Sequence, residues 1–524
     1  MFLPEQLKMK SKKELLSKIV NGRYFTGIAV SLFLFLLLLP LSLKIDFMQN
    51  DDWVYYGMVE NFMKLDFRLD PLSAPTFYTQ GILGTLFAGI FGLQSLPILT
   101  LIISVLCFFV FYIILLRHFN LGRFESVLVS LLLFFNPLFI YSVWGFMTEN
   151  YFLLFMLLSI LFYLESVNVP SRKNLFLYVV FIFLALNIRQ VALVLPLSGF
   201  VYSLFKRNVR PLLLNLGVLV GLGVYYVFIF PLTAEMSEKS LQFHHLQSSP
   251  YVYSLIYGSF ILATALLLPL LLPIFKEKKK LKWALFLGLA VVAYILLNRY
   301  FQPSKVSWGE FPYFENTLER KGFYPRGVLG TKYYFKYMFD LYRHWDSAAK
   351  IVLSLFVAYA VLKIKKINGL WAVFTIIYMG VMTVTETYYD RYLLILIPVL
   401  IFIILGVNGF GKVNKFLSVS FLAFLIFYNY QFSMDFILVN KYIWNKSEEL
   451  VVKYDKEPRR VQGTNAWKLK YLNERRNYVF DFTYDSSEIN KSYRDLYTTE
   501  EGKKIEFPGS LWVKPYIYLY QKID

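Results

Sequence analysis

The sequence predicts an all-α polytopic membrane protein, and three observations lead to this prediction. The chain has 524 residues, is 57% hydrophobic and has a mean hydropathy of +0.50. Apolar runs of about 20 residues, the length needed to cross a bilayer, recur along it. Short loops rich in lysine and arginine separate these runs.

The first apolar run, at 24–45, is too long for a signal peptide and lacks a small-residue cleavage site, so we expect a retained span. The basic residues 1–23 before it should be cytoplasmic, because lysine and arginine accumulate on that side. The net charge of +19 then reflects contact with membrane lipids, since no nucleic-acid-binding motif is present. The single cysteine, Cys107, excludes an intramolecular disulfide.

The other basic loops orient the remaining spans. They lie at 117–123, 172–173, 206–210, 276–282, 363–366 and 412–415. If all of them are inside, the outer side of the cell membrane receives 46–76, 142–149, 189–190, 233–250, 299–346, 386–391 and everything after about 434.

Two apolar runs, 77–93 and 97–116, follow the first outer loop, and only one of them can span if Arg117 is cytoplasmic. The run 77–93 is short and is interrupted by glycines, so we expect an interfacial or re-entrant helix there. The prediction is about thirteen spans, a cytoplasmic N-terminus and an extracytoplasmic C-terminus.

The chain divides into a transmembrane domain and a charged C-terminal part. The transmembrane domain covers 24–434, with a first external loop at 46–96 and a large one at 299–346. Residues 435–524 lose the long apolar runs. Helical patterning at 441–456 and 466–474, with strand-like "NYVFDFTY" and "SLWVKPYIYLY", predicts a small extracytoplasmic α/β domain.

Paired acids, Asp51 and Asp52, follow the first span directly. Tyr55 is four residues after Asp51 and would share one face of a short interfacial helix with it. Helix capping by Asn50 or Asp51 explains one acid but not both. Two acids at a membrane surface suit a general base, because a like charge and partial burial raise one pKa toward neutrality.

Three further charged residues fall on the predicted outer side. Glu149 starts a span, where the helix dipole alone would favour a carboxylate. Arg189 lies between two apolar runs and Arg391 begins another. Guanidinium groups bind phosphate through paired hydrogen bonds, so both arginines suit a lipid phosphate. The alternatives are a salt bridge between Arg189 and Glu149, and an interfacial anchor at Arg391.

Loop 299–346 adds Arg326 and Lys332 as candidate substrate-binding residues, although a solvated basic face would explain them equally well. The adjacent His244 and His245 are a weak metal signal, so a divalent metal is possible but not indicated.

These residues resemble a family. The Asp51-Asp52-Trp53-Val54-Tyr55 element, "NPLFIYSVWGFMTENYFLLFMLL" and "DRYLLILIP" are similar to motifs of the GT-C glycosyltransferases that use polyprenyl-phosphate sugars, above all the protein O-mannosyltransferase and aminoarabinose transferase group. The resemblance covers most of residues 24–410. Two features differ: "YTQGIL" stands where that group has a Pro-Pro-Leu element, and Glu149 where Asp is usual.

The resemblance implies an inverting sugar transfer from a polyprenyl-phosphate donor to an acceptor hydroxyl of a lipid, glycan or protein. Asp51 would be the general base, Asp52 and Glu149 would orient acceptor and base, and Arg189 or Arg391 would neutralise the departing phosphate. No cofactor is required. The alternatives are a transporter or lipid flippase built on an Arg189–Glu149 pair, and a lipid-linked glycan polymerase or ligase using loop 299–346 with His344.

Overall fold

The computed structural model describes residues 22, 24–74, 76–169, 171–230, 250–271, 280–301, 317–319, 322–323, 345–385, 388–461, 463–471, 478–482, 493–495 and 517–522. Within these residues, eight helical segments are long and apolar enough to cross a membrane. They are Phe25–Ser42, Leu93–His118, Thr148–Asn168, Val209–Ile229, Leu281–Tyr300, Trp345–Leu362, Asp390–Val407 and Lys412–Val452. The chain is therefore a mainly α-helical, multi-pass membrane protein.

In order, the helices that make up these segments are α2 (Phe25–Ser42), η1 (Leu93–Ser95), α5 (Leu96–His118), α8 (Thr148–Asn168), α11 (Val209–Val224), η3 (Tyr225–Ile229), α15 (Lys280–Tyr300), α16 (Trp345–Leu362), η7 (Asp390–Ile395), α18 (Leu396–Asn408) and α19 (Lys412–Val452). Between them lie α3 (Asp52–Met63), α4 (Tyr78–Phe91), α6 (Arg123–Phe134), α7 (Pro137–Tyr141), α9 (Arg172–Leu186), η2 (Gln190–Leu193), α10 (Val194–Lys206), α13 (Pro250–Ala265), α14 (Leu268–Leu271), η6 (Ile364–Lys366) and α17 (Gly369–Thr383), followed by η8 (Pro458–Arg460) and α20 (Asn465–Lys470).

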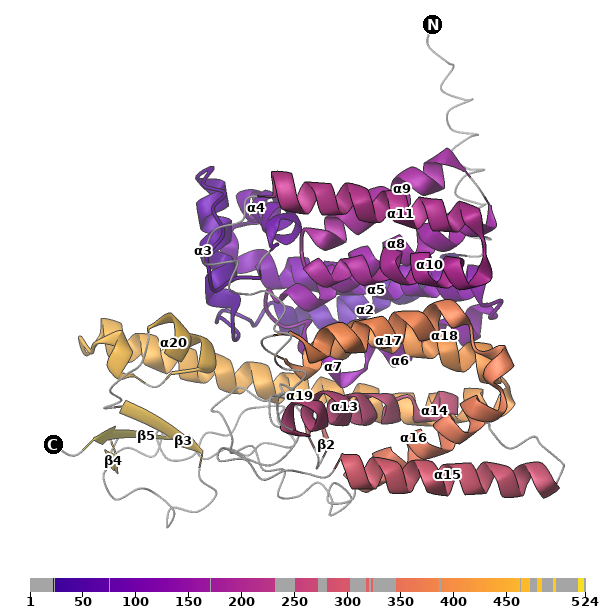
Figure 1. The fold of residues 1–524 in the computed structure, drawn as a ribbon. Coiled ribbons are helices and arrows are strands. Elements are labelled where there is room, and N and C mark those ends of the chain that lie inside the picture. The colour runs from indigo at the N-terminus through magenta and orange to yellow at the C-terminus, as the bar shows by residue number, and fades with distance from the viewer. Residues whose placement is uncertain are drawn as a thin grey trace, which may run out of the picture.

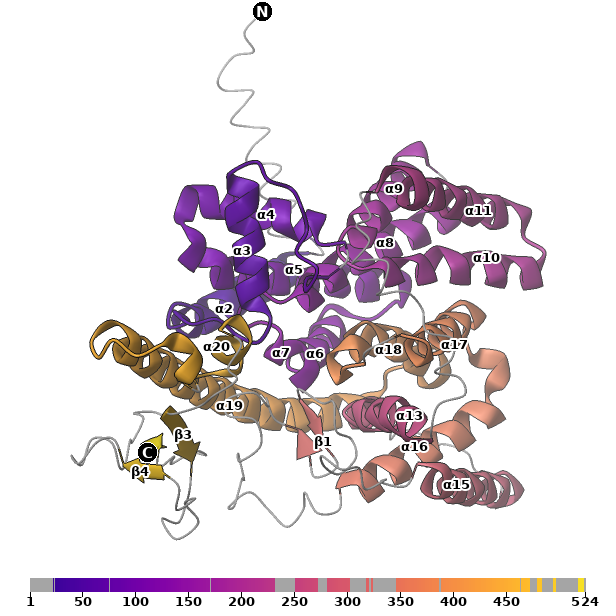
Figure 2. The ribbon, with the colours of Figure 1, turned by 60° about the vertical axis from the view of Figure 1, so that its left-hand side comes forward.

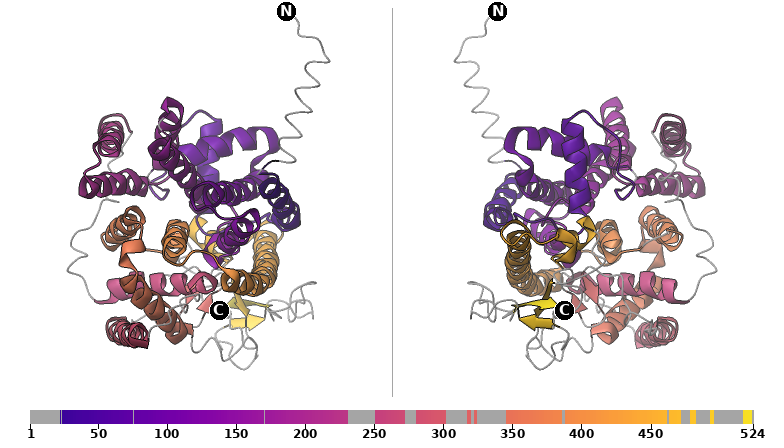
Figure 3. Two further views of the ribbon diagram at one scale, coloured as in Figure 1. Left: turned by 90° about the vertical axis from the view of Figure 1, so that its right-hand side faces the viewer. Right: turned by 90° about the vertical axis from the view of Figure 1, so that its left-hand side faces the viewer.

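The long helices run side by side, and two short helices lie together at one end of them. Figure 1 shows α10, α15 and α17 running across the page, with α3 turned across them and α20 near it at the left. After a 60° turn, α20 still lies beside α3 (Figure 2). Figure 3 looks along the helices from both ends of the bundle. We call the end with α3 and α20 the α3 end.

Ion pairs tie helices together at the opposite end. Arg117 donates to the Tyr24 hydroxyl from Nε at 2.8 Å and pairs with Glu165 at 3.0 Å, which joins the start of α2 to the ends of α5 and α8. Lys415 pairs with Glu125, joining the starts of α19 and α6. The basic loops 117–123 and 412–415 therefore lie at the same end of the bundle as the start of α2. This is expected if all three lie on one side of the membrane. We call this the Arg117 end.

The helix α4 does not cross between the two ends of the bundle. It follows α3, and η1, the element after it, contacts α3 again, so both ends of α4 lie at the α3 end. Its glycines serve packing: a Cβ at Gly81 would come within 2.5 Å of the Phe62 ring, and one at Gly84 within 2.6 Å of the Phe146 ring. Close approach of α4 to α3 and to the turn before α8 therefore requires glycine at both positions.

The chain does not break where the C-terminal domain was expected to begin. Position 435 lies inside α19, a continuous helix of 41 residues. Most of the helical pattern predicted at 441–456 is the last part of α19, and the pattern at 466–474 overlaps α20. Beyond them, β3 (Tyr478–Phe482), β5 (Ile517–Lys522) and β4 (Tyr493–Asp495) pair antiparallel in the order β3-β5-β4, with Phe480 opposite Leu519.

A two-stranded ribbon lies in the expected loop 299–346. It consists of β1 (Leu318–Glu319) and β2 (Gly322–Phe323), paired antiparallel. The loop is bounded by the end of α15 at Tyr300 and the start of α16 at Trp345.

Candidate functional site

The two adjacent acids at the start of α3 have different environments. Asp51 occupies the position before the first helical residue, but its side chain makes no capping hydrogen bond. The capping alternative is therefore wrong for Asp51. The residue before it, Asn50, has a left-handed backbone with φ of 44°, a conformation that asparagine tolerates better than most residues. The two carboxyl groups that follow it contact different neighbours.

Asp52 is fully buried against backbone. Its Oδ1 accepts from the Phe146 N–H at 3.0 Å and its Oδ2 from the Gln49 N–H at 3.0 Å. Gly145 adopts φ of 111°, and a Cβ there would lie 2.5 Å from Asp52 Oδ2. Asp52 therefore fastens the start of α3 to the turn before α8 and leaves no surface for an acceptor.

Burial also changes the proton affinity of Asp52. It raises the pKa of this carboxyl to about 8, against the two backbone hydrogen bonds, which lower it; the charges of Asp51 and Glu149 add a smaller increase. The expectation that one acid of the pair has a raised pKa thus applies to Asp52. This group is nevertheless enclosed, so proton affinity alone does not make it the base.

Asp51 is the accessible member of the pair. Its side chain is 32% exposed. Its Oδ2 accepts from Arg391 Nη2 at 3.0 Å and from Asn50 Nδ2 at 3.2 Å. Asp51 therefore keeps an exposed surface while one oxygen is held by a buried guanidinium.

Glu149 lies in the first turn of α8 with a side chain only 2% exposed. Its Oε1 lies 2.6 Å from Arg189 Nη2 and 3.0 Å from Arg391 Nε. The helix dipole favours an acid at this position, as expected, but two arginines contact it as well. The sequence predicted only that Glu149 and Asp51 lie on the same side of the membrane. In the structure, Arg391 contacts both carboxylates.

Arg391 is the second residue of the segment η7 and is 4% exposed. It lies between Asp51 and Glu149, and its guanidinium carbon is 4.6 Å from the centre of the Tyr389 ring. Within the described residues, its Nη1 and the Glu149 Oε2 are buried and have no hydrogen-bond partner. A buried donor without a partner is costly, so this position suits an acceptor atom that arrives with a ligand.

Arg189 precedes η2 and completes a row of alternating charges. Its Nε and Nη2 donate to Thr148 Oγ1 at 3.1 and 2.5 Å, and its guanidinium stacks over the Tyr392 ring at 4.6 Å. The salt bridge between Arg189 and Glu149, one of the alternatives for this arginine, is present. It is not isolated, because Arg391 shares the same carboxylate oxygen. The row Asp51–Arg391–Glu149–Arg189 is called the charged row below.

Tyr55 lies beside the charged row but is largely covered. It is 6% exposed, and its ring stacks on Phe77 with centres 4.8 Å apart. Burial first, and then the charges of Asp51 and Glu149, raise the pKa of its hydroxyl above its usual value. Its place fits the predicted position on α3 next to the acids.

Sequence reasoning missed three residues that hold the site. Asp390 accepts from the Thr317 and Leu318 N–H groups at 2.8 and 2.6 Å, which fixes β1 beside η7. Thr148 supports Arg189, and Asn465 of α20 donates to Asn50 Oδ1 at 2.6 Å. The adjacency of Asp390 to Arg391 and of Thr148 to Glu149 was the only available signal, whereas nothing in the sequence connects Asn465 with Asn50.

Several predicted residues lie outside the described part of the chain. They are Arg326, Lys332, His244, His245 and His344. Among the residues that are described, no group of three or more His, Cys, Asp or Glu side chains is placed to hold a metal ion.

Comparison with models of known protein families gives no match to this chain, and a comparison with curated proteins gives none either.

Proposed function

We propose that the chain is a membrane glycosyltransferase that moves a sugar from a polyprenyl-phosphate donor to an acceptor hydroxyl outside the cell membrane. Asp51 removes the proton from the acceptor hydroxyl. The oxygen then attacks the anomeric carbon from the side opposite the lipid phosphate, and the carbon–oxygen bond to that phosphate breaks. The configuration inverts in this single displacement.

One observation carries the proposal: Asp51 combines an accessible carboxylate with a buried partner. It is 32% exposed, yet Arg391, 4% exposed, fixes one of its oxygens. A general base needs both an approach for its substrate and a fixed geometry. Asp52 is enclosed by backbone and lacks the first property.

The leaving group sets the requirement for the arginines. Negative charge on the phosphate grows as the bond to the sugar breaks, and donors already in place stabilise that charge best. The unpartnered Nη1 of Arg391 and the stacked guanidinium of Arg189 suit this role. Arg391 then contacts both Asp51 and the departing phosphate. The acceptor hydroxyl, next to Asp51, therefore lies close to the anomeric carbon. Glu149 orients both arginines.

The orientation is part of the same proposal. The eight long spans, together with α6, α9, α10, α13 and α17, would give thirteen passes between the two ends. The basic loops gather at the Arg117 end, which we assign to the cytoplasm. The acids, and a C-terminal α/β domain containing β3, β5 and β4, would then be extracytoplasmic.

A direct test uses the purified protein and synthetic polyprenyl-phosphate sugars, with release of polyprenyl phosphate as the measured product. The proposal expects release that depends on an added acceptor. Unchanged donors with every hexose and pentose tried would contradict it.

A second function, transport or lipid flipping, is favoured by the Arg189–Glu149 ion pair. Proteoliposomes distinguish the two functions. Uptake of solute or movement of lipid without sugar transfer would support the transporter. Sugar transfer without uptake supports the glycosyltransferase.

A further inference from the structure

A buried glutamine beside the charged row has an amide that the protein does not pair. Gln49 is 4% exposed, and within the described residues neither its Oε1 nor its Nε2 makes a hydrogen bond. Most buried side-chain polar atoms in native proteins are hydrogen-bonded, because an unpaired donor or acceptor keeps the full cost of its desolvation. The Gln49 amide therefore suits a ligand that brings its own hydrogen-bonding groups.

The backbone holds Gln49 in place. Its N–H donates to Asp52 Oδ2 at 3.0 Å, and its carbonyl accepts from the Asp52 N–H at 2.8 Å. On the other side of the amide, a Cβ at Gly145 would lie 3.0 Å from Gln49 Oε1. The turn before α8 that encloses Asp52 thus also borders the Gln49 side chain, which is positioned by packing and not by hydrogen bonds of its own.

Tyr141, the last residue of α7, connects the amide with the charged row. Burial raises the pKa of the Tyr141 hydroxyl, while the Arg391 guanidinium and the Gln49 amide each lower it, so both groups lie close to this oxygen. Arg391 also contacts the carboxylate of Asp51 at 3.0 Å. The unpaired amide therefore lies in the neighbourhood of the proposed base and of the guanidinium that holds it.

The amide differs from the arginines of the charged row in what it can bind. It offers donors and an acceptor without a charge, whereas a guanidinium offers only donors and a positive charge. A phosphate oxygen is anionic and accepts hydrogen bonds, so the guanidinium groups suit it better. A hydroxyl both donates and accepts, and it can pair with either end of the amide. Next to a site for a phosphate, such hydroxyls belong to a sugar.

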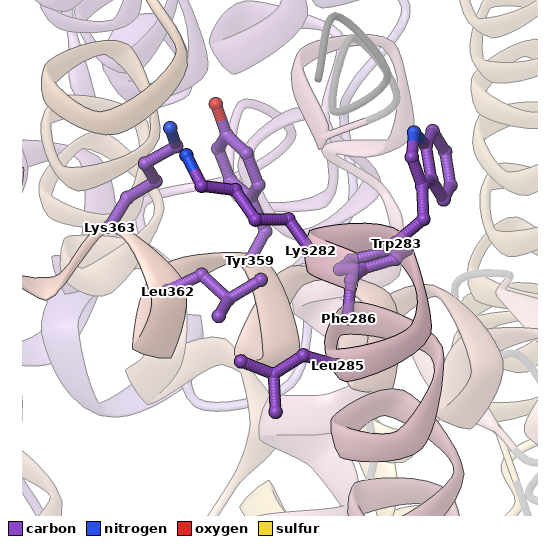
Figure 4. A pocket seen from close by; sticks show the side chains of 7 residues that line it. All are labelled: Lys282, Trp283, Leu285, Phe286, Tyr359, Leu362 and Lys363. Atoms are coloured by element: carbon purple, nitrogen blue, oxygen red, sulfur yellow. The ribbon is translucent and has the colours of Figure 1, made fainter. Parts of the chain in front are cut away.

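A pocket elsewhere in the bundle lacks the groups for this role. It has a volume of about 180 Å³ and lies between the first turn of α15 and the last turn of α16, away from α3 (Figure 1). Figure 4 shows the lysine, aromatic and leucine side chains that line it. None of these lining residues carries a carboxylate, so none can take a proton from an acceptor as Asp51 can.

We infer that Gln49 is a specificity-determining residue that hydrogen-bonds a ring hydroxyl of the transferred sugar. Its Oε1 accepts from that hydroxyl, and its Nε2 donates to the same hydroxyl or to the next one on the ring. A donor without this hydroxyl leaves the buried amide unpaired and is therefore discriminated against. The inference rests on the proposed function, because it requires a sugar between Asp51 and the departing phosphate.

The test compares the wild type with Gln49→Met, whose side chain is similar in length but has no amide. The probes are the polyprenyl-phosphate sugar that the wild type uses fastest and its monodeoxy analogues, and kcat/KM is measured from release of polyprenyl phosphate. We expect one analogue to be used at least about tenfold less well by the wild type, the equivalent of one hydrogen bond. In Gln49→Met this ratio should shrink by about tenfold, and the ratios for the other analogues should stay within about twofold of the wild type.

Gln80→Met is the matched control. Gln80 is also buried at the α3 end, but its Nε2 donates to the Phe146 carbonyl at 2.8 Å. Its replacement should lower the midpoint of thermal unfolding, because that carbonyl loses its donor, and any loss of rate should be equal for every donor. Gln49→Met without donor should unfold at the wild-type midpoint or above it, because it removes a buried amide that the protein leaves unpaired.

The two proposals fail in different ways. Release of polyprenyl phosphate from no donor by the wild type would contradict the proposed function, and this inference with it. With an active wild type, equal use of all analogues would overturn the inference without any variant. Unchanged ratios in Gln49→Met, the same loss with every donor, or a lowered midpoint would each overturn it as well, because the protein or a bound water would then pair the amide.

Discussion

At the scale of single residues, adjacent side chains of the same type have taken different tasks. Asp51 and Asp52 share a chemistry and are adjacent in the chain, but adjacent side chains at the start of a helix face different neighbours. Asp52 joins two backbone segments, whereas Asp51 faces Arg391 and retains exposed surface. The sequence predicted that one of the pair is a base. It did not predict that the other is structural, because the partners of Asp52 are backbone N–H groups that no side-chain pattern reveals.

The raised pKa of Asp52 predicts how stability depends on pH. Its carboxyl has a pKa of about 8 when folded against an ordinary value of 3.8, so between these values the folded state binds more protons than the unfolded state. Stability should therefore fall as pH rises from about 5 to about 8, by on the order of 1 kcal/mol per unit at most. Thermal unfolding of the protein in detergent at several pH values measures this.

The comparison for that measurement is Asp52→Asn. The asparagine offers one acceptor where the carboxyl offers two, so the midpoint should drop at every pH, by about 1–3 kcal/mol in free energy. The decline with pH should be weaker, because the titrating group is gone. Parallel curves for the two proteins would show that Asp52 does not titrate in this range.

Arg189 yields the second prediction at this scale. Its planar guanidinium contacts Thr148 and Glu149 and stacks over Tyr392, and the ammonium of lysine cannot reproduce that combination. Arg189→Lys should therefore slow sugar transfer by more than about tenfold. Arg117→Lys provides a control, since Arg117 also pairs with a glutamate but at the opposite end. Similar rates in both variants would leave Arg189 without a part in the reaction.

At the scale of elements, glycines and helix contacts explain what the sequence pattern showed only in outline. The run 77–93 was expected not to span, and both ends of α4 lie at the α3 end. The apolar pattern could not show that Gly81 and Gly84 let α4 approach α3, because the partners Phe62 and Phe146 are distant in sequence. The boundary expected at 434/435 lies inside α19, which becomes more polar along its length without ending there.

The contact between α20 and the start of α3 links the C-terminal segment to the proposed base. Asn465 donates to Asn50 Oδ1 at 2.6 Å, and Asn50 Nδ2 donates to Asp51 Oδ2 at 3.2 Å. Asn465→Ala should loosen Asp51 and lower kcat by about fivefold, the equivalent of one hydrogen bond, with little change in KM for the donor. Lys470→Ala, exposed on the same helix, should leave kcat unchanged. A rise in KM for the donor with unchanged kcat would instead indicate that α20 contacts the substrate.

At the scale of the whole molecule, the distribution of charge along the sequence predicted which loops share one side of the membrane better than it predicted which side chains contact each other. The basic loops 117–123 and 412–415 lie with the start of α2, and the acids with Arg391 at the α3 end. Each span carries the chain to the other side of the membrane. The positions of lysine and arginine therefore predict which helix ends lie together. The pairing of Asp51, Glu149 and the two arginines depends on tertiary packing over more than 300 residues, which composition and spacing do not encode.

The absolute orientation is measurable with single cysteines. Lys453→Cys at the end of α19 should react with a membrane-impermeant maleimide in intact cells, and Lys365→Cys, at the Arg117 end, should react only after permeabilisation. Both positions are exposed, and the native Cys107 is buried, so it contributes little background. The reverse labelling pattern would place the charged row in the cytoplasm.

The most direct test of the central claim is the rate of sugar transfer by Asp51→Asn. Asparagine preserves the size of the side chain but cannot accept the proton, so transfer should fall by about 10²–10⁴ while donor binding and folding remain. Asp46→Asn, in the same loop and paired with Lys441, is the matched control and should retain its rate. If Asp51→Asn transfers sugar at a rate near that of Asp46→Asn, Asp51 is not the base.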